Sequence, residues 1–245
     1  METELHTPTI RDAKELTSQL VGAFPEIEAV LLCGSVARGD ANPWSDIDLL
    51  LTSSDPKLTV AELRKVIAER NNVSLIYYRT PSFATSWQRH PLFTAHLKKE
   101  GVVLFDPVGV LSRMLDTPNF TKANVAEEIR QYRAKLAPYR YPKRYNNNFL
   151  FCLSRLYSIG KGVIMLGLAS RGVLEFNRDT ALQRFATLNP DMSERVAAVA
   201  RLRPFYRLVS DRKPEPLPFS YHDAAIEMED AVNAIDSLAE RVICL

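Results

Sequence analysis

The sequence predicts an α+β chain, in which a small β-sheet with flanking helices is followed by an all-helical domain. Apolar runs alternate with helical patterns up to Pro107, whereas every periodic segment after it has helical spacing. Residues 1–106 carry 11 Lys and Arg against 14 Asp and Glu, and residues 107–245 carry 20 against 15. With 46% hydrophobic residues, the chain can bury two small cores. We therefore expect one domain over 1–107 and a second over 108–245.

The first domain is expected to alternate between strands and helices. Residues 9–24 have apolar residues at helical spacing and stop before Pro25, which predicts the first helix. Thr59 and Glu62 form a capping-box pair, so a second helix is expected over 60–70. Four strands are predicted, over 28–33, 47–52, 73–79 and 102–106. A short helix is predicted over 91–101 and ends at Gly101.

The second domain is expected to contain helices alone. Five segments have helical periodicity, and the loop 210–219 separates the last two. There is no internal repeat and no low-complexity segment. The predicted helical segments are 124–137, 146–172, 178–188, 192–203 and 221–242.

Several broad classes of protein are not favoured. The acidic N-terminus has no apolar stretch and is not a secretory signal. The longest uninterrupted apolar stretch, 162–169, is too short to span a bilayer, so we expect no membrane partner. Three cysteines without metal-ligand spacing predict a reduced, cytoplasmic protein. His90 and His96 have no second type of zinc ligand nearby and are expected on helix surfaces.

Two carboxylates stand at the start of the second predicted strand. Strand alternation places Asp46 and Asp48 on the same face, with Ile47 turned into the core. Such a pair suits Mg²⁺, which binds one or two carboxylates together with phosphate oxygens and water. The Asp46-Ile47-Asp48 pair alone is better explained as ordinary residues at a strand entrance. In combination with the preceding Gly-Ser pair, it predicts a metal site for Mg²⁺ or Mn²⁺.

The end of the preceding strand has the features of a phosphate site. Gly34 has no Cβ and lets a phosphate approach the backbone, and Ser35 offers a hydroxyl and an N–H at the start of a short helix. A Gly-Ser pair alone is a common turn, but its combination with two acids on the next strand is rare. The combination predicts transfer of a nucleoside monophosphate from an NTP to a hydroxyl.

The segment GSVARGDANPWSDIDLLL, residues 34–51, resembles the signature of the DNA polymerase β-type nucleotidyltransferase superfamily. The branch it resembles contains minimal nucleotidyltransferases, antibiotic adenylyltransferases and nucleotidyltransferase toxins and antitoxins. The resemblance implies a small mixed sheet followed by helices, ATP as the expected donor, and nucleotide binding by Gly34, Ser35, Arg38 and Ser45.

One family residue is missing from this pattern. The family places a third carboxylate on a later strand, where this chain has Ser74 in NNVSLIYYR. Two explanations stay open: a base from the helical domain, with Glu127 and Glu128 as candidates, or a reduced or lost transferase activity. Of the two, we select Glu127 as the candidate, although a first-turn acidic pair is also favoured by the helix dipole.

The helical domain contains a long basic segment. No acidic residue stands between Glu128 and Glu175, and tyrosines alternate with basic residues in RAKLAPYRYPKRYNNNF. This composition suits a surface for a triphosphate or for RNA, with Arg155 and Lys161 as the predicted nucleotide ligands. The alternative is a solvated basic face that the acidic last helix neutralises.

The acceptor is not identified by the sequence. A basic domain disfavours a polycationic drug and leaves RNA, protein or a neutral small molecule as acceptors. Trp44 either stacks on the nucleotide base or anchors its loop, with the anchor favoured. The alternative functions are a catalytically weak regulatory module that binds RNA or protein, and a helical domain that forms a homodimer.

Overall fold

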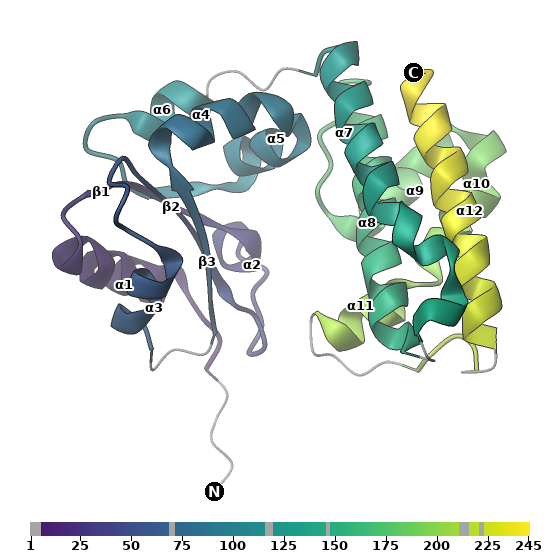
Figure 1. The fold of residues 1–245 in the computed structure, drawn as a ribbon, viewed down its shortest axis with the longest axis horizontal. Coiled ribbons are helices and arrows are strands. Elements are labelled where there is room, and N and C mark those ends of the chain that lie inside the picture. Colours follow the sequence, from purple (N-terminus) through teal and green to yellow (C-terminus); the bar gives the residue numbers. More distant parts are fainter. Residues whose placement is uncertain (1–5, 69–71, 116–119, 146–147, 211–215, 221–222) are drawn as a thin grey trace, which may run out of the picture. The chain divides into compact units, whose positions relative to one another are not determined.

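The computed structural model describes residues 6–68, 72–115, 120–145, 148–210, 216–220 and 223–245 of the chain. The chain forms two compact units, Met1–Pro118 and Asn119–Leu245 (Figure 1). The division lies later than the predicted boundary after Pro107. The reason is α6 (Val110–Leu115), whose residues Val110 and Leu111 are buried in the core of the first unit.

The first unit is built on a four-stranded mixed sheet in the order β3-β2-β1-β4. β1 (Ile27–Cys33) pairs antiparallel with both β2 (Ile47–Ser53) and β4 (Val102–Phe105), and β3 (Val73–Arg79) runs parallel to β2. The structure confirms all four predicted strands to within one residue at each end. Strands that are covered on both faces are expected to be nearly continuous apolar runs, as β1 and β2 are.

Helices cover both faces of this sheet (Figure 1). Consecutive residues of β2 alternate between two cores, because Leu49 packs with Leu16 and Leu63 on one face and Leu50 packs with Phe83 on the other. The first core is closed by α1 (Ile10–Ala23), α2 (Gly34–Arg38) and α3 (Val60–Val66), and the second by α4 (Thr80–Arg89), α5 (Pro91–Glu100) and α6.

The predicted capping box of α3 forms only in part. The Thr59 hydroxyl accepts the Glu62 N–H at 3.3 Å, as expected for an N-cap. The Glu62 carboxylate, however, binds Lys65 at 2.8 Å, one turn further along the helix. The helix ends at Val66 and is shorter than predicted, and positions 69–70 of the prediction lie outside the described residues.

Two helices were missed because of proline. The segment of α4 contains Pro81 and several hydroxyl residues, which indicate a loop. Proline is nevertheless tolerated in a first turn, and Phe83, 1% exposed, fixes the helix on the sheet. In the second unit the helix predicted over 192–203 ends at Ala200, and a further helix that was not predicted begins at Arg203 with Pro204 in its first turn.

The second unit is a bundle around one long apolar helix, α8 (Phe149–Ala169). By length and composition α8 could span a membrane, but 72% of its most apolar window is buried in the unit. An all-round apolar helix of this kind is the centre of a bundle. The other members of the bundle are α7 (Lys122–Leu136), α9 (Arg178–Leu188), α10 (Ser193–Ala200), α11 (Arg203–Val209) and α12 (Ala224–Ile243).

Candidate active site

The ends of three strands bring Asp48 together with Cys33 and Ser74. The strand register places Asp48 opposite Cys33 across the antiparallel β1–β2 pair and opposite Ser74 across the parallel β2–β3 pair. Residues in register on neighbouring strands point to the same face and lie about 5 Å apart. The Asp48 carboxylate therefore projects from the middle of the three strands at one end of the sheet.

Asp46 and Asp48 form an interacting pair, as the sequence predicts. Asp46 lies immediately before β2, and Ile47 between them is 1% exposed in the opposite core. Burial raises the pKa of the Asp48 carboxyl above its ordinary value, and the negative charge of Asp46 raises it further. The two carboxylates are thus close enough to repel each other.

Two neighbours favour the ionised form of Asp48 but do not offset the rise in its pKa that burial and Asp46 cause. The Ser74 hydroxyl donates a hydrogen bond to the carboxylate, and the Arg38 guanidinium contributes positive charge. The net direction of the pKa shift is still upward. Additional positive charge at this position would relieve the repulsion, which is the property expected of a cation site.

Gly34 lies directly against this carboxylate. Its φ angle is +74°, a conformation that side chains other than glycine rarely adopt. A Cβ at this position would overlap Asp48 Oδ2 and lie 3.0 Å from Asp48 Cγ. Both the backbone conformation and the close approach therefore require glycine here, and the bare backbone of the β1–α2 turn faces the carboxylate.

Ser35 occupies the first turn of α2. The Ser35 carbonyl accepts the N–H groups of Gly39 and Asp40, which closes this short helix. No hydrogen bond among the described residues uses the Ser35 hydroxyl. The side chain is half-buried near Gly34, so its predicted role in binding phosphate stays a prediction.

Arg38 is held by two carboxylates. It binds Asp40 and Glu100, each at 3.2 Å, and the same oxygen of Glu100 contacts His96 Nε2 at 2.9 Å. Burial would lower the pKa of Arg38, but these two partners raise it. Glu100 could not be predicted from the sequence, because it lies 62 residues from Arg38 and only the packing of α5 beside α2 joins them. His96, expected on the surface, is partly buried by this contact.

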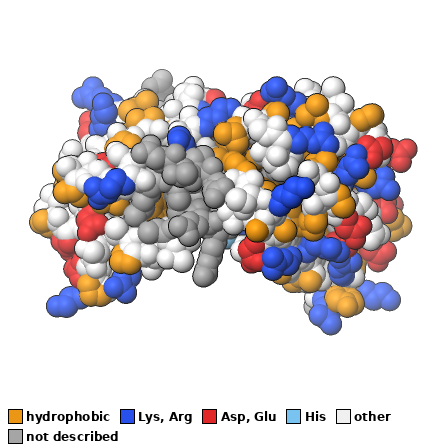
Figure 2. All heavy atoms as spheres, turned by 90° about the horizontal axis from the view of Figure 1, so that it is seen from above, with side chains coloured by type: hydrophobic (Ala, Val, Ile, Leu, Met, Phe, Trp, Pro, Cys, Tyr) orange, Lys and Arg blue, Asp and Glu red, His pale blue; other side chains and the backbone are white. Residues whose placement is uncertain are grey.

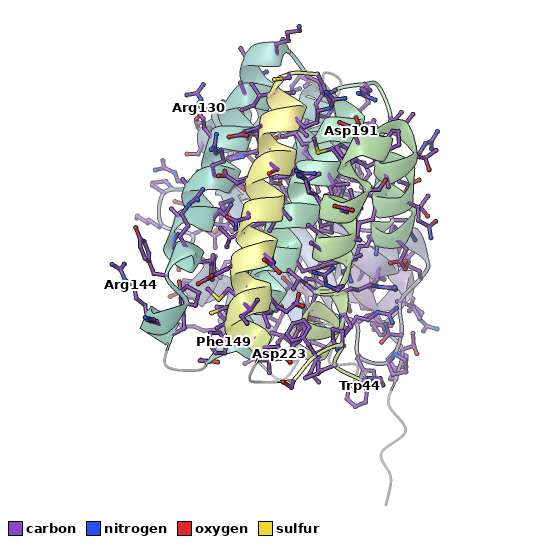
Figure 3. All side chains as sticks on the ribbon, turned by 90° about the vertical axis from the view of Figure 1, so that its right-hand side faces the viewer. Trp44, Arg130, Arg144, Phe149, Asp191 and Asp223 are labelled. Carbon is purple, nitrogen blue, oxygen red and sulfur yellow. The ribbon has the colours of Figure 1, made fainter. Side chains whose placement is uncertain are left out.

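Ser45 and Trp44 belong to the loop before β2. The Ser45 N–H donates to the Asn42 carbonyl at 2.8 Å, and its hydroxyl accepts the Asn42 N–H at 2.9 Å. Ser45 thus holds the loop in place. The Trp44 side chain projects outward and is 46% exposed, so it does not anchor the loop through burial (Figure 3).

Among the described residues of the first unit, no other acid takes the place of the third carboxylate. Ser74 lies in register with Asp48, at the position where the family pattern places an acidic residue. Within the described residues, no group of three or more His, Cys, Asp or Glu side chains could hold a metal ion. The site in the first unit consists of two carboxylates, one serine hydroxyl and one nearby guanidinium.

The other predicted site residues lie in the second unit. Glu127, on α7, pairs with Arg130 at 2.7 Å. On α8, Arg155 is exposed and lies 5.0 Å from the centre of the Phe151 ring, and Lys161 lies 5.5 Å from the Tyr206 ring. Their roles toward a nucleotide stay predictions.

Part of the basic segment is neutralised, as the alternative interpretation expects. Asp236 of α12 binds Arg133 at 2.8 Å and Arg140 at 2.7 Å. Arg133 also lies 3.5 Å from Glu240. On the face of the second unit seen in Figure 2, Lys and Arg side chains are accordingly interspersed with Asp and Glu.

Known proteins share both the sequence pattern and the fold. Residues 10–103 match a family model described as a nucleotidyltransferase domain. The structure resembles a spectinomycin adenyltransferase from Enterococcus faecialis, crystallised with ATP and spectinomycin, with a TM-score of 0.55 and 13% identity over 93% of this chain and 98% of that chain. A nucleotidyltransferase-like protein from Exiguobacterium sibiricum gives a TM-score of 0.42 and 14% identity over 94% and 75%. No curated protein sequence matches the chain significantly.

The family match begins at α1, ends in β4 and contains every site residue described in the first unit, Ser74 included. The mixed sheet followed by a helical unit is also the fold of the adenyltransferase. Residues 10–103 therefore match a nucleotidyltransferase domain, and the chain as a whole shares the fold of the adenyltransferase.

Proposed function

We propose that the protein transfers a nucleoside monophosphate from an NTP to an acceptor hydroxyl, with ATP as the donor. The observation that carries this proposal is the contact between Gly34 and Asp48, where bare backbone meets an acid of raised pKa beside a second acid. The family match supports the reaction class, and the ATP bound to the adenyltransferase of similar fold supports the donor. The acceptor is RNA, protein or a small molecule.

The donor set fits a divalent cation. Asp46 and Asp48 supply hard carboxylate oxygens, their mutual repulsion favours a positive charge between them, and Gly34 has no Cβ that would displace the Asp48 carboxylate. Mg²⁺ or Mn²⁺ held there would neutralise charge on the phosphates and on the leaving pyrophosphate. Phosphate-bound metal of this kind usually keeps water ligands as well, so two protein carboxylates are sufficient to hold it.

The residues of the chain then have separate roles. Asp46 and Asp48 would bind the divalent cation and orient the phosphates on it. The β1–α2 backbone at Gly34 and Ser35 would face the triphosphate, and Arg38 would add positive charge. The acceptor hydroxyl attacks the α-phosphorus, the bond to the pyrophosphate oxygen breaks, and the hydroxyl proton passes to a base. Glu127 is our candidate for that base.

Transfer of label from α-labelled ATP tests the proposal. The full chain is incubated with each α-labelled NTP, Mg²⁺ or Mn²⁺, and a panel of RNA, cell lysate and small hydroxyl compounds. Label is expected in an acceptor with the wild-type chain and not with Asp46→Asn/Asp48→Asn. Asp230→Asn, the same change at an exposed site on α12, is the matched control. Equal labelling by the double variant would refute the proposal.

A second candidate function is a regulatory module with weak catalysis. The observation that favours it is Ser74, since a serine hydroxyl adds no negative charge to a metal site. Ser74→Asp supplies the missing carboxylate in register with Asp48. A large gain in transfer by Ser74→Asp over a weak wild type supports the regulatory module, whereas strong wild-type transfer that Ser74→Asp leaves unchanged or lowers argues for a two-carboxylate enzyme.

A further inference from the structure

Aromatic side chains gather where the short helices η1 (Ala137–Arg140) and η2 (Pro142–Tyr145) meet the start of α8. The rings of Tyr139 and Tyr145 stack, with centroids 5.6 Å apart and planes 14° from parallel. Tyr141 is 55% exposed and Phe151 is 47% exposed. Exposed large rings that lie close together are uncommon on a surface without a binding partner.

Two arginines complete this surface. The Arg144 guanidinium lies 4.5 Å from the centre of the Tyr141 ring and projects away from the helices (Figure 3), and Arg155 lies 5.0 Å from the Phe151 ring. Burial raises the pKa of Tyr139, and the nearby charge of Arg155 opposes that rise. The six side chains therefore form one continuous tyrosine–arginine surface, made of Tyr139, Tyr141, Arg144, Tyr145, Phe151 and Arg155.

The positive charge of this surface is not neutralised by the bundle. Arg140, at its edge, is paired with Asp236 and does not contribute. By contrast, Arg144, Arg155 and the exposed Lys143 form no ion pair with any of the residues that the structure describes. The sequence also has no acid between positions 129 and 174. The surface thus presents free cations next to ring faces.

This combination points to a ligand that has both flat rings and phosphates. Bases stack on aromatic and guanidinium planes, while backbone phosphates bind Arg and Lys. An acidic peptide would use the cations and leave the rings exposed. Binding to a lipid surface scales with the apolar area that is buried, and that area is small here because tyrosines, which carry a hydroxyl, supply three of the four rings. We propose that the second unit binds single-stranded RNA, with bases on Tyr141 and Phe151 and phosphates on Lys143, Arg144 and Arg155.

RNA is favoured over DNA by the chemistry of the first unit. The reaction proposed there consumes a hydroxyl, and every ribose of RNA carries a 2′-hydroxyl that DNA lacks. The choice of RNA over DNA thus rests on the proposed function, whereas base stacking and phosphate binding by the second unit do not depend on the transfer reaction. The two proposals can therefore fail separately: Asp46→Asn/Asp48→Asn is expected to bind RNA as tightly as the wild type does.

Fluorescence anisotropy of a labelled single-stranded RNA of about 16 nucleotides with the full chain tests the inference. Tyr141→Ala and Phe151→Ala are each expected to weaken binding about fivefold or more, since stacking is lost. Tyr141→Phe keeps the ring and is expected to bind as the wild type does. Arg144→Gln is expected to reduce the slope of log K against log salt by about 0.7.

Matched changes on other helices are the controls. Ile226→Ala removes an exposed apolar side chain from α12, and Arg184→Gln removes an exposed charge from α9. Neither is expected to change RNA binding or its salt slope. Equal effects of the control and surface variants, no binding at low salt, or equal binding of DNA and RNA would overturn the inference. Binding of the full chain to anionic lipid vesicles but not to RNA would also overturn the inference.

Discussion

Two aspartates, one in each unit, experience opposite electrostatic environments. Burial would raise the pKa of Asp236 in the bundle, but its hydrogen bond to Arg140 and the charge of Arg133 lower it below its ordinary value. At the sheet end, burial raises the pKa of Asp48, and Asp46 raises it further. Both carboxylates are partly buried, yet only one of them has arginine partners that bind it directly.

This difference separates an acid that stabilises the fold from an acid that is available to a ligand. Arg133 and Arg140 satisfy the charge of Asp236 within the bundle. The Asp46–Asp48 pair keeps its repulsion, and a folded chain retains such a pair more readily where a ligand relieves it.

Substitution of Gly34 is expected to eliminate transfer. In Gly34→Ala the new methyl group overlaps Asp48 Oδ2 and displaces the carboxylate, and a misplacement of about 1 Å in an active site can cost about 100-fold in rate. The transfer rate from α-labelled ATP is measured for the purified variant.

Gly39→Ala is the matched control for this change. Gly39 also has a positive φ, +78°, but a Cβ there meets no atom within 4 Å. Both variants are expected to lose about 1–2 kcal/mol of stability through backbone strain. If Gly39→Ala lost as much activity as Gly34→Ala, backbone strain and not the Asp48 contact would explain the loss.

Neutralising Asp236 and neutralising Asp48 should change the free energy of unfolding in opposite directions. Asp236→Asn is expected to lower the free energy of unfolding by about 1–3 kcal/mol at neutral pH, because two arginines lose their charged partner. Asp48→Asn is expected to leave that free energy unchanged or to increase it, since the repulsion with Asp46 is removed. Urea denaturation without divalent cations measures both.

The pH dependence follows from the directions of the two pKa shifts. The pKa of Asp236 is depressed in the folded state, so its stabilisation is present above the unfolded value, near 3.8, and is lost as the pH falls through the folded pKa. The pKa of Asp48 is raised, so its ionisation destabilises the fold as the pH rises from near 3.8 through the folded pKa. Similar destabilisation by both substitutions at neutral pH would contradict the comparison.

A smaller effect is expected at the contact between α2 and α5. Glu100→Gln removes one of the two carboxylates that hold Arg38, while Asp40 retains the other contact. We expect the KM for the NTP to rise about fivefold with little change in kcat. Glu62→Gln, which breaks the exposed pair with Lys65 on α3, is the control and should change neither constant.

Local patterns in the sequence were sufficient for the sheet and for part of the site. The leucine-rich runs of β1 and β2 predict strands, and the alternation across Ile47 places Asp46 and Asp48 on one face. The position of Ser74 was also expected from the family pattern, and the register with Asp48 agrees with it. These features depend on residues that are near each other in the chain or on a known motif.

Features that depend on tertiary packing could not be predicted in this way. Nothing near Arg38 indicates Glu100. The sequence suggests that the acidic last helix neutralises the basic segment, but it does not indicate that Asp236 pairs with Arg133 and Arg140 in particular. The exposure of Trp44 is likewise set by how the loop is held through Asn42. In each case the partner is chosen by the three-dimensional arrangement of elements, for which periodicity carries no information.

The central claim is that Asp46 and Asp48 gather a divalent cation at the Gly34 backbone. Its most direct test is electron paramagnetic resonance of Mn²⁺ titrated into the full chain with a non-hydrolysable ATP analogue. We expect the wild type and Asp230→Asn to bind Mn²⁺ and Asp46→Asn/Asp48→Asn not to bind it. Undiminished binding of Mn²⁺ by the double variant would contradict it.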